Sequence, residues 1–179
     1  MTDQHLNLKG IVRARADASQ YLKQAGDAVI VERQGPRWLI LCCPCGCGAE
    51  LPVNLDRRAG PAWRLYQSHK GLSLYPSVWR DSGCESHFII LRNKIWMMGS
   101  RFGETTFEDS EISDEDLAKG VLAALSAQYQ SAESLSDRIP GSVPWDVMQA
   151  CRKLCRRGFA SEGRGAAIGQ FRRREQTSF

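Results

Sequence analysis

A dense cluster of thiols occupies residues 42–47, which hold four of the seven cysteines in the chain: Cys42, Cys43, Cys45 and Cys47. The proline and glycine residues between them allow the backbone to turn sharply around an ion. Zinc takes four sulfur or nitrogen ligands in a tetrahedron, commonly from two separate loops. Cys84 and His87 can supply the second loop. Because clustered thiols in a reducing compartment commonly hold metal, the two segments predict a zinc site.

Two ligand sets fit this spacing. The first, which the spacing alone slightly favours, is a CxxC…CxxH pattern made of Cys42, Cys45, Cys84 and His87. The second leaves His87 free and uses cysteines alone, namely Cys43, Cys45, Cys47 and Cys84. Each set fills all four positions around a zinc ion. Since no position stays open for water, both sets predict a structural rather than a catalytic metal.

Ser77 and His87 stand on the two arms of an expected hairpin. Residues 81–83 (Asp-Ser-Gly) indicate a three-residue turn with glycine in the left-handed position, which pairs Arg80 with Cys84. In that register Ser77 lies directly opposite His87, with Cβ atoms about 4.5–5.5 Å apart. An imidazole within reach of a hydroxyl is the minimum arrangement for an activated serine nucleophile. Three carboxylates are candidates for orienting the imidazole: Glu85, Asp56 and Glu50.

Three motifs carry a family resemblance: CPCGCG at residues 43–48, LYPSV at 74–78 and CESHF at 84–88. In this order, with Trp63 and Trp96 between and after them, they resemble the BubE family over roughly residues 25–100. That family belongs to bacterial operons that encode ubiquitin-like proteins with E1-like and E2-like enzymes. The resemblance implies a peptidase that processes or removes the ubiquitin-like modifier, with a place in antiviral defence.

The resemblance also implies roles for single residues and partners. Ser77 matches the nucleophile and His87 matches the base. The family pattern begins at Cys43, which makes Cys42 an ordinary buried strand residue. The zinc ligands that it implies are all cysteines: Cys43, Cys45, Cys47 and Cys84. The implied partners are a ubiquitin-like protein or its conjugates and the E1-like and E2-like enzymes.

Short apolar segments broken by Gly, Pro and Asn predict an antiparallel β-rich domain that positions these groups. The expected strands are residues 29–32, 38–41, 72–80, 87–91 and 95–98. The first two form a hairpin around Gln34-Gly35-Pro36. Residues 14–25 are expected to form a short helix that ends at Gly26.

The chain changes character after residues 104–116, which contain seven acids and no base. Helical periodicity predicts helices at residues 114–126 and 131–139, and a third that begins at residue 143 and ends before Gly158. Ser113 is the expected N-cap of the first helix. A glycine-rich hairpin follows at residues 159–171. Three helices and a hairpin predict a winged helix-turn-helix domain, with Cys151 and Cys155 on its core-facing side.

The third helix and the hairpin carry a net charge of 8 − 3 = +5, from Arg152, Lys153, Arg156, Arg157, Arg164, Arg172, Arg173 and Arg174 against Asp146, Glu162 and Glu175. In a DNA-binding protein such a helix enters the major groove and its arginines contact phosphates. The same fold also serves as a docking module for a protein partner. Both uses fit the charge, and Asp146 stands in the first turn, where base contacts would be made.

Composition is that of a globular protein: 179 residues, 42% hydrophobic, with a net charge of 24 − 20 = +4. We expect an α+β protein with a zinc-stabilised β-rich domain at residues 1–108, a boundary near 108–111 and a winged-helix-like domain at 111–179. No apolar segment approaches the roughly 20 residues that span a bilayer, and no signal-peptide pattern occurs, so the expected location is the cytoplasm without a membrane partner. The expected function is that of a Ser–His peptidase with a structural zinc. The alternative is a non-enzymatic zinc protein that binds DNA or recruits a partner.

Overall fold

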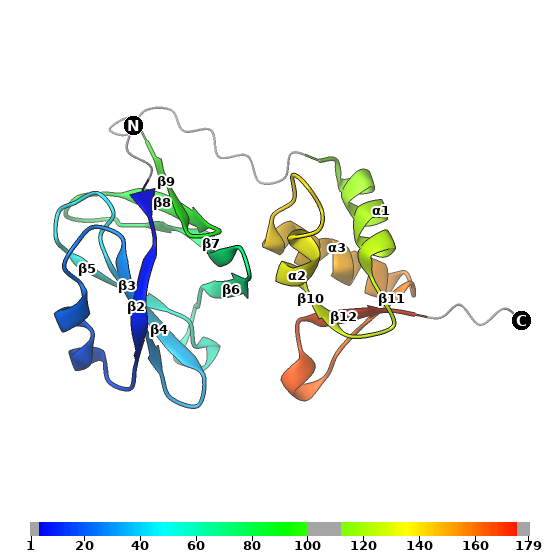
Figure 1. Ribbon diagram of the computed structural model, residues 1–179, viewed down its shortest axis with the longest axis horizontal. Helices are drawn as coiled ribbons and strands as arrows, with labels where there is room; N and C mark the ends of the chain where they lie inside the picture. The colour runs from blue at the N-terminus through cyan, green and yellow to red at the C-terminus, as the bar shows by residue number, and fades with distance from the viewer. Residues whose placement is uncertain (1–3, 100–111, 175–179) are drawn as a thin grey trace, which may run out of the picture. The chain divides into compact units, whose positions relative to one another are not determined.

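The computed structural model describes residues 4–99 and 112–174, and the chain divides into two compact units (Figure 1). One unit comprises Met1–Tyr66 with Gly71–Phe107, and the other comprises Glu108–Phe179 with Gln67–Lys70. The expected boundary at residues 108–111 lies outside the described residues, as does the first part of the acidic segment.

The N-terminal unit contains two β-sheets. The four-stranded sheet has the order β2-β3-β4-β5, in which β2 runs parallel to β3 and the remaining pairs are antiparallel. The five-stranded sheet has the order β1-β9-β8-β7-β6, with antiparallel pairing from β1 through β7. The strands are β1 (Gln4–His5), β2 (Asn7–Val12), β3 (Asp27–Glu32), β4 (Pro36–Cys42), β5 (Glu50–Asn54), β6 (Arg64–Ser68), β7 (Gly71–Trp79), β8 (His87–Leu91) and β9 (Lys94–Met98).

One hydrophobic core joins the two sheets. Leu39 and Leu41 of β4 pack in the same buried cluster as Phe88 and Ile90 of β8, and all four side chains are almost fully buried. Cys43, directly after β4, is also fully buried in this cluster, and Cys84 packs against it. The cysteine segments therefore lie at the edge of the core that the two sheets share.

The strands expected from the apolar segments are all present, and the expected hairpin is the β3–β4 pair. The expected helix at residues 14–25 is wrong, because that segment forms two 3-10 turns, η1 (Arg15–Asp17) and η2 (Ser19–Tyr21). Val29 and Val31 are buried on the outer face of β3, and Ala18 packs over them. An irregular segment, not a regular helix, covers that face of β3. A third 3-10 turn, η3, covers Arg57–Ala59.

The C-terminal unit has helices and a small sheet. The helices are α1 (Asp114–Ala124), α2 (Ala132–Ser136) and α3 (Pro144–Arg156), close to the expected positions. The sheet has the order β10-β12-β11, made of β10 (Gln130–Ser131), β11 (Ala160–Glu162) and β12 (Gln170–Arg173), with the 3-10 turn η4 (Gly165–Ala167) before β12.

The ends of the helices follow the expected chemistry. Ser113 Oγ accepts a hydrogen bond from the Asp116 N–H at 3.2 Å, as the N-cap prediction requires. Three acids fill the first turn of α1, where the helix dipole favours negative charge. Cys151 is fully buried on α3 and Cys155 is half-buried. Within the described residues, no helix has the length and apolar character that crossing a membrane requires.

Candidate metal centre and serine–histidine pair

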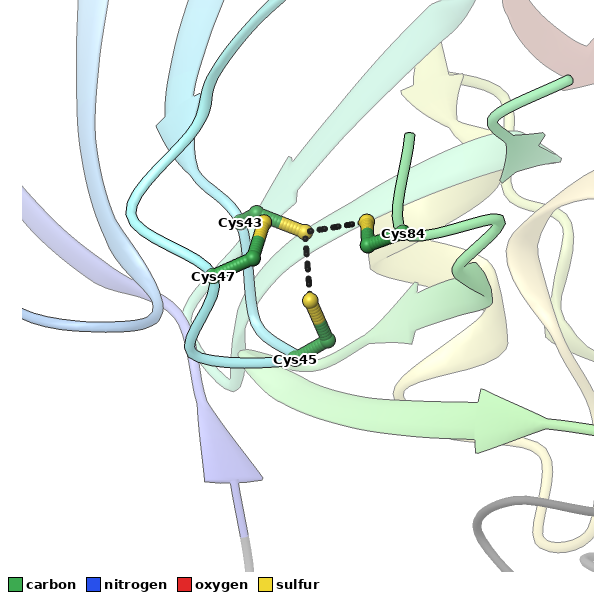
Figure 2. Close-up of side chains that lie close together, drawn as sticks. All are labelled: Cys43, Cys45, Cys47 and Cys84. Atoms are coloured by element: carbon green, nitrogen blue, oxygen red, sulfur yellow. Dashed lines mark hydrogen bonds between the residues drawn. The ribbon is translucent and has the colours of Figure 1, made fainter. Parts of the chain in front are cut away.

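Four cysteine side chains converge from two loops (Figure 2). Cys43, Cys45 and Cys47 stand in the turn between β4 and β5, and Cys84 stands in the loop between β7 and β8. Their sulfur atoms all lie within 4.8 Å of one another. The Cys43 Sγ is 3.3 Å from the Cys45 Sγ and 3.7 Å from the Cys84 Sγ, and the cysteines are free thiols.

The turn that carries three of these thiols depends on glycine. The Gly46 N–H donates to the Cys43 carbonyl at 3.1 Å, and the Cys43 N–H donates to the Ala49 carbonyl at 2.8 Å. Gly46 and Gly48 have φ values of +84° and +76°, in the left-handed region that a residue with a Cβ rarely adopts. Alternating glycines therefore fold the turn so that Cys43, Cys45 and Cys47 reach one point.

The donor set fits a tetrahedral zinc ion. A Zn–S distance of about 2.3 Å in a tetrahedron separates neighbouring sulfur atoms by about 3.8 Å. The separations of 3.3 and 3.7 Å from the Cys43 Sγ approach that spacing without a disulfide, and all four sulfur atoms lie within 4.8 Å of one another. Four thiolate donors with no further protein group are typical of a structural zinc site. Such a metal would join the loop after β4 to the loop after β7, and so one sheet to the other.

The clustered thiols differ in acidity. Burial raises the pKa of the Cys43 thiol, and burial raises that of Cys45 well above its ordinary range. Hydrogen bonding to Ser86 lowers the pKa of Cys84 to about 5. A metal that binds here must displace the protons of the buried thiols, so its affinity is expected to fall as the pH falls.

The two sequence-based ligand sets differ in how they match the structure. The sulfurs that come together are those of the all-cysteine set. Cys42 is the last residue of β4, pairs with Glu50 across the sheet and lies outside the group. The Nε2 atom of His87 faces Ser77 instead of the thiols. The CxxC…CxxH set is therefore not brought together.

Ser77 and His87 do meet. The Ser77 Oγ is 2.9 Å from the His87 Nε2, a hydrogen-bond distance, and both residues are half-buried. If the imidazole is neutral with its proton on Nδ1, Nε2 accepts the serine proton and can remove it. The tilted indole of Trp79 lies 6.0 Å from the imidazole, centroid to centroid.

The register that brings them together differs from the expected one. His87 pairs with Trp79, and the N–H of Arg80 donates to the Ser86 carbonyl, so the expected Arg80–Cys84 and Ser77–His87 pairs are wrong. A bulge between Leu74 and Val78, which includes the cis Tyr75–Pro76 peptide, shifts the register by two residues. Because side chains alternate with a period of two, this shift keeps Ser77 on the face of His87, diagonal to it.

The carboxylates considered for orienting the imidazole are engaged elsewhere or exposed. Asp56 accepts hydrogen bonds from the Arg58 side chain, at 2.8 Å from Nε, and Glu50 accepts one from Ser19 at 3.0 Å. Glu85 is exposed on the loop before His87. Within residues 4–99 and 112–174, no carboxylate contacts His87. The described arrangement is a hydrogen-bonded serine–histidine pair.

Two further side chains contact the site, and pattern reasoning did not assign them. Trp63 donates from its indole Nε1 to the carbonyl of Ser77 at 3.2 Å, which fixes the backbone of that serine. Arg80 donates from Nη1 to the Cys84 sulfur at 3.1 Å and approaches the Cys47 sulfur at 3.8 Å. The position of a basic residue close before Cys84 is the signal that could have pointed to Arg80.

The part of the chain that contains these residues matches a known protein family. Residues 14–98 match the model of a family described as the bacterial ubiquitination-like system serine protease, BubE. The match confirms the family likeness of the three motifs and contains Ser77, His87 and all four clustered cysteines. No curated protein and no solved structure matches the chain.

Proposed function

We propose that the N-terminal unit is a Ser–His peptidase that processes or deconjugates a bacterial ubiquitin-like protein. The proposal starts from residues 14–98, which match the model of a family described as a serine protease of a bacterial ubiquitination-like system. The single observation that carries it is the 2.9 Å contact between the Ser77 Oγ and the His87 Nε2. The modifier itself, its conjugates and the E1-like and E2-like enzymes are the proposed partners, in the cytoplasm.

The chemistry follows from this contact. The Ser77 Oγ attacks the carbonyl carbon of the scissile bond while the His87 Nε2 takes the hydroxyl proton. The imidazolium then gives that proton to the departing amine or hydroxyl, which leaves an acyl group on Ser77. Water attacks this ester with His87 again as the base, and the acid product and free Ser77 result. The Trp63 indole holds the backbone of the nucleophile in place through the Ser77 carbonyl.

Zinc is the proposed ion for the cysteine cluster, with Cys43, Cys45, Cys47 and Cys84 as its ligands. Four protein ligands leave no open position, so the proposed role is to join the loops that border the reactive pair. The chemistry that zinc supplies here is structural cross-linking. The zinc-site cysteines and the Ser–His pair are therefore separate parts of one proposed enzyme.

The decisive experiment incubates the full chain with the ubiquitin-like protein of its own operon, extended beyond its mature C-terminus. We expect cleavage by the wild type and none above background by Ser77→Ala or His87→Ala. Ser82→Ala, an exposed serine in the same hairpin loop, is the matched control and should cleave normally. A fluorophosphonate probe should label Ser77 alone. Equal cleavage by the wild type and Ser77→Ala, or no cleavage and no labelling of the wild type, would contradict the proposal.

A second function is proposed for residues 111–179, as a winged-helix domain separate from a zinc domain at residues 1–108. The supporting observation is the order α1-β10-α2-α3-β11-β12 with the sheet order β10-β12-β11, in which the last two strands form a hairpin after the longest helix. Limited proteolysis should cut between the two domains and leave both folded. Cleavage that unfolds either half would contradict this division.

The proposed ligand of this domain is a protein partner, with DNA as the alternative. The first turn of α3 contains the buried Pro144 and Trp145 together with Asp146, which does not suit reading of base edges. Two cations of α3 are already paired, Arg152 with Glu162 and Lys153 with Asp114. A DNA affinity that falls steeply with salt would support the DNA alternative, and no binding to duplex DNA would remove it.

A further inference from the structure

The cysteine cluster has a second layer of contacts that is not part of its expected ligand set. Zinc held by four thiolates carries a formal charge of about −2, which is costly to keep partly buried without a counter-charge. The guanidinium of Arg80 contacts two of these sulfur atoms, at 3.1 Å from Cys84 and 3.8 Å from Cys47. Arg80 thus bridges the two loops from which the thiols come.

The local backbone leaves room for this guanidinium. Gly83 has a φ of +74°, and a Cβ at that position would come within 3.2 Å of the Arg80 Nη2. A side chain there would be strained and would press on the arginine. An arginine guanidinium stays cationic at every pH at which a protein is folded.

Ser86 completes the layer from the interior. Its hydroxyl is fully buried and lies 3.3 Å from the Cys43 sulfur and 3.4 Å from the Cys84 sulfur. When both sulfurs are thiolates, the hydroxyl can only act as a donor, with its single proton directed to one sulfur or shared between the two. The Arg80 N–H bonds to the Ser86 carbonyl at 3.0 Å, so the two residues are held together.

We infer that Arg80 and Ser86 form a charge-balancing clamp that sets the metal affinity of the thiolate centre. Partners of this kind orient metal ligands, and their loss commonly weakens metal binding by about 10–100-fold. Arg80 carries the charge and spans the two loops, while Ser86 donates from the buried side. The clamp contacts the metal ligands and belongs to neither the Ser77–His87 pair nor the ligand set.

The test measures zinc affinity of the full chain by competition with a chromophoric chelator, and the absorption spectrum of the cobalt-loaded protein. We expect Arg80→Met to bind zinc about 10–100-fold more weakly and Ser86→Ala to be weakened in the same direction, both with a tetrahedral thiolate cobalt spectrum. Arg80→Lys keeps the positive charge but lacks the planar guanidinium with its several N–H donors. Its zinc affinity should lie between those of the wild type and Arg80→Met. Arg33→Met, an exposed arginine of the same unit, is the matched control.

Affinity of Arg80→Met within twofold of the wild type would overturn the inference, and so would an equal loss in Arg33→Met. Because Arg80 is half-buried, its variants should fold, and the cobalt spectrum reports the centre directly. No step needs peptidase activity, so the result is independent of the proposed function.

A separate observation concerns Trp79, whose side chain is 72% exposed although it is the largest apolar residue type. It pairs directly with His87 and stands two residues from Ser77 on the same face of β7. Exposed tryptophans next to a reactive centre commonly serve as anchors for a binding partner. Tyr75, two residues on the other side of Ser77, is also exposed, at 37%.

Resting on the proposed function, we propose that Trp79 docks the extended C-terminal segment of the ubiquitin-like substrate beside the scissile bond. Trp79→Ala should raise KM for the extended modifier at least tenfold, while kcat falls less than threefold. Trp79→Phe should recover most of the affinity. Tyr21→Ala, an aromatic residue of the same unit that is 41% exposed, is the matched control.

The outcomes separate the two proposals. A fluorophosphonate that fails to label wild-type Ser77 would contradict the peptidase itself. Labelling of the wild type combined with an unchanged KM in Trp79→Ala would overturn the docking role. A loss confined to kcat would also overturn it, because Trp79 would then act only by positioning His87.

Discussion

Removal of one thiol from the cysteine cluster tests whether a metal joins the two sheets of the N-terminal unit. The variant Cys84→Ala deletes the only clustered thiol on the loop between β7 and β8. Its matched control is Cys42→Ala, which deletes a buried cysteine that neighbours the cluster and contributes no sulfur to it. Both variants remove one sulfur from the same chain, so only the clustered position should affect the metal.

The expected size of the effect follows from the loop that the metal closes. Cys43 and Cys84 are 41 residues apart. Closing a loop of that length removes about 13 cal/mol/K of chain entropy from the unfolded state, or about 4 kcal/mol at 25 °C. For a domain of this size the loss corresponds to a fall of about 15–30 °C in Tm. Cys42→Ala should cost about 1 kcal/mol, the price of a small cavity.

The assay combines metal analysis of the purified full chain with thermal unfolding followed by calorimetry. The wild type and Cys42→Ala should each hold one zinc, and Cys84→Ala should hold none or lose it to a weak chelator. A strong chelator should lower the Tm of the N-terminal unit and leave that of the helical unit in place. The reasoning is refuted if Cys84→Ala keeps a full equivalent of zinc and unfolds within about 1 kcal/mol of the wild type.

Three further predictions concern single side chains. Trp63→Phe removes the hydrogen bond to the Ser77 carbonyl, worth about 0.5–1.5 kcal/mol, and should slow fluorophosphonate labelling of Ser77 by about 2- to 13-fold. Hydrogen bonds from Arg58 lower the pKa of Asp56 from 3.8 to about 2. The ionised carboxylate therefore contributes its full stabilisation above about pH 4, and this stabilisation is lost as the pH falls to 2. Asp56→Asn should lack this loss of stability at low pH, which we call the acid limb, when urea midpoints are measured across pH. Phe88→Ala, at a fully buried core position, should cost about 3–5 kcal/mol in denaturant unfolding.

Each of these has a control and a contrary outcome. Trp38→Phe, on the outer face of the four-stranded sheet, should leave labelling unchanged, and an equal effect in both variants would remove the role of Trp63. Asp81→Asn, an exposed aspartate, should keep the acid limb, which must disappear only in the Asp56 variant. Phe88→Leu should cost much less than Phe88→Ala. Equal costs would show that the cavity does not determine the loss.

Local patterns in the chain were sufficient for five of the nine described strands of the N-terminal unit and for the three helices, and they did not predict β1, β2, β5 or β6. Apolar segments between turn residues gave the correct positions for β3, β4, β8 and β9, because their side chains face a shared core. The pattern failed at residues 14–25, where an amphipathic segment covers the outer face of β3 in two 3-10 turns. What a segment covers is decided by the sheet beneath it, and that information lies elsewhere in the chain.

The hairpin register shows the same limit at a single pair. A glycine turn predicts a three-residue loop, but the loop must also carry Cys84 toward the thiols of another sheet, and β7 contains a bulge. The bulge between Leu74 and Val78 moves the pairing by two residues. The predicted contact between Ser77 and His87 survived because an even shift keeps both side chains on one face.

Residue types and their order by themselves determined the available chemistry: thiols dense enough for zinc, a serine and a histidine on neighbouring strands, and three motifs of one family. Only the tertiary structure decided which thiols meet, because four sulfur atoms converge only when two loops from different sheets approach across a common core. It also decided that His87 faces Ser77 rather than the thiols, and that Arg80 and Ser86 line the cluster. Those choices depend on distances between residues far apart in the chain, and spacing along a sequence does not contain them.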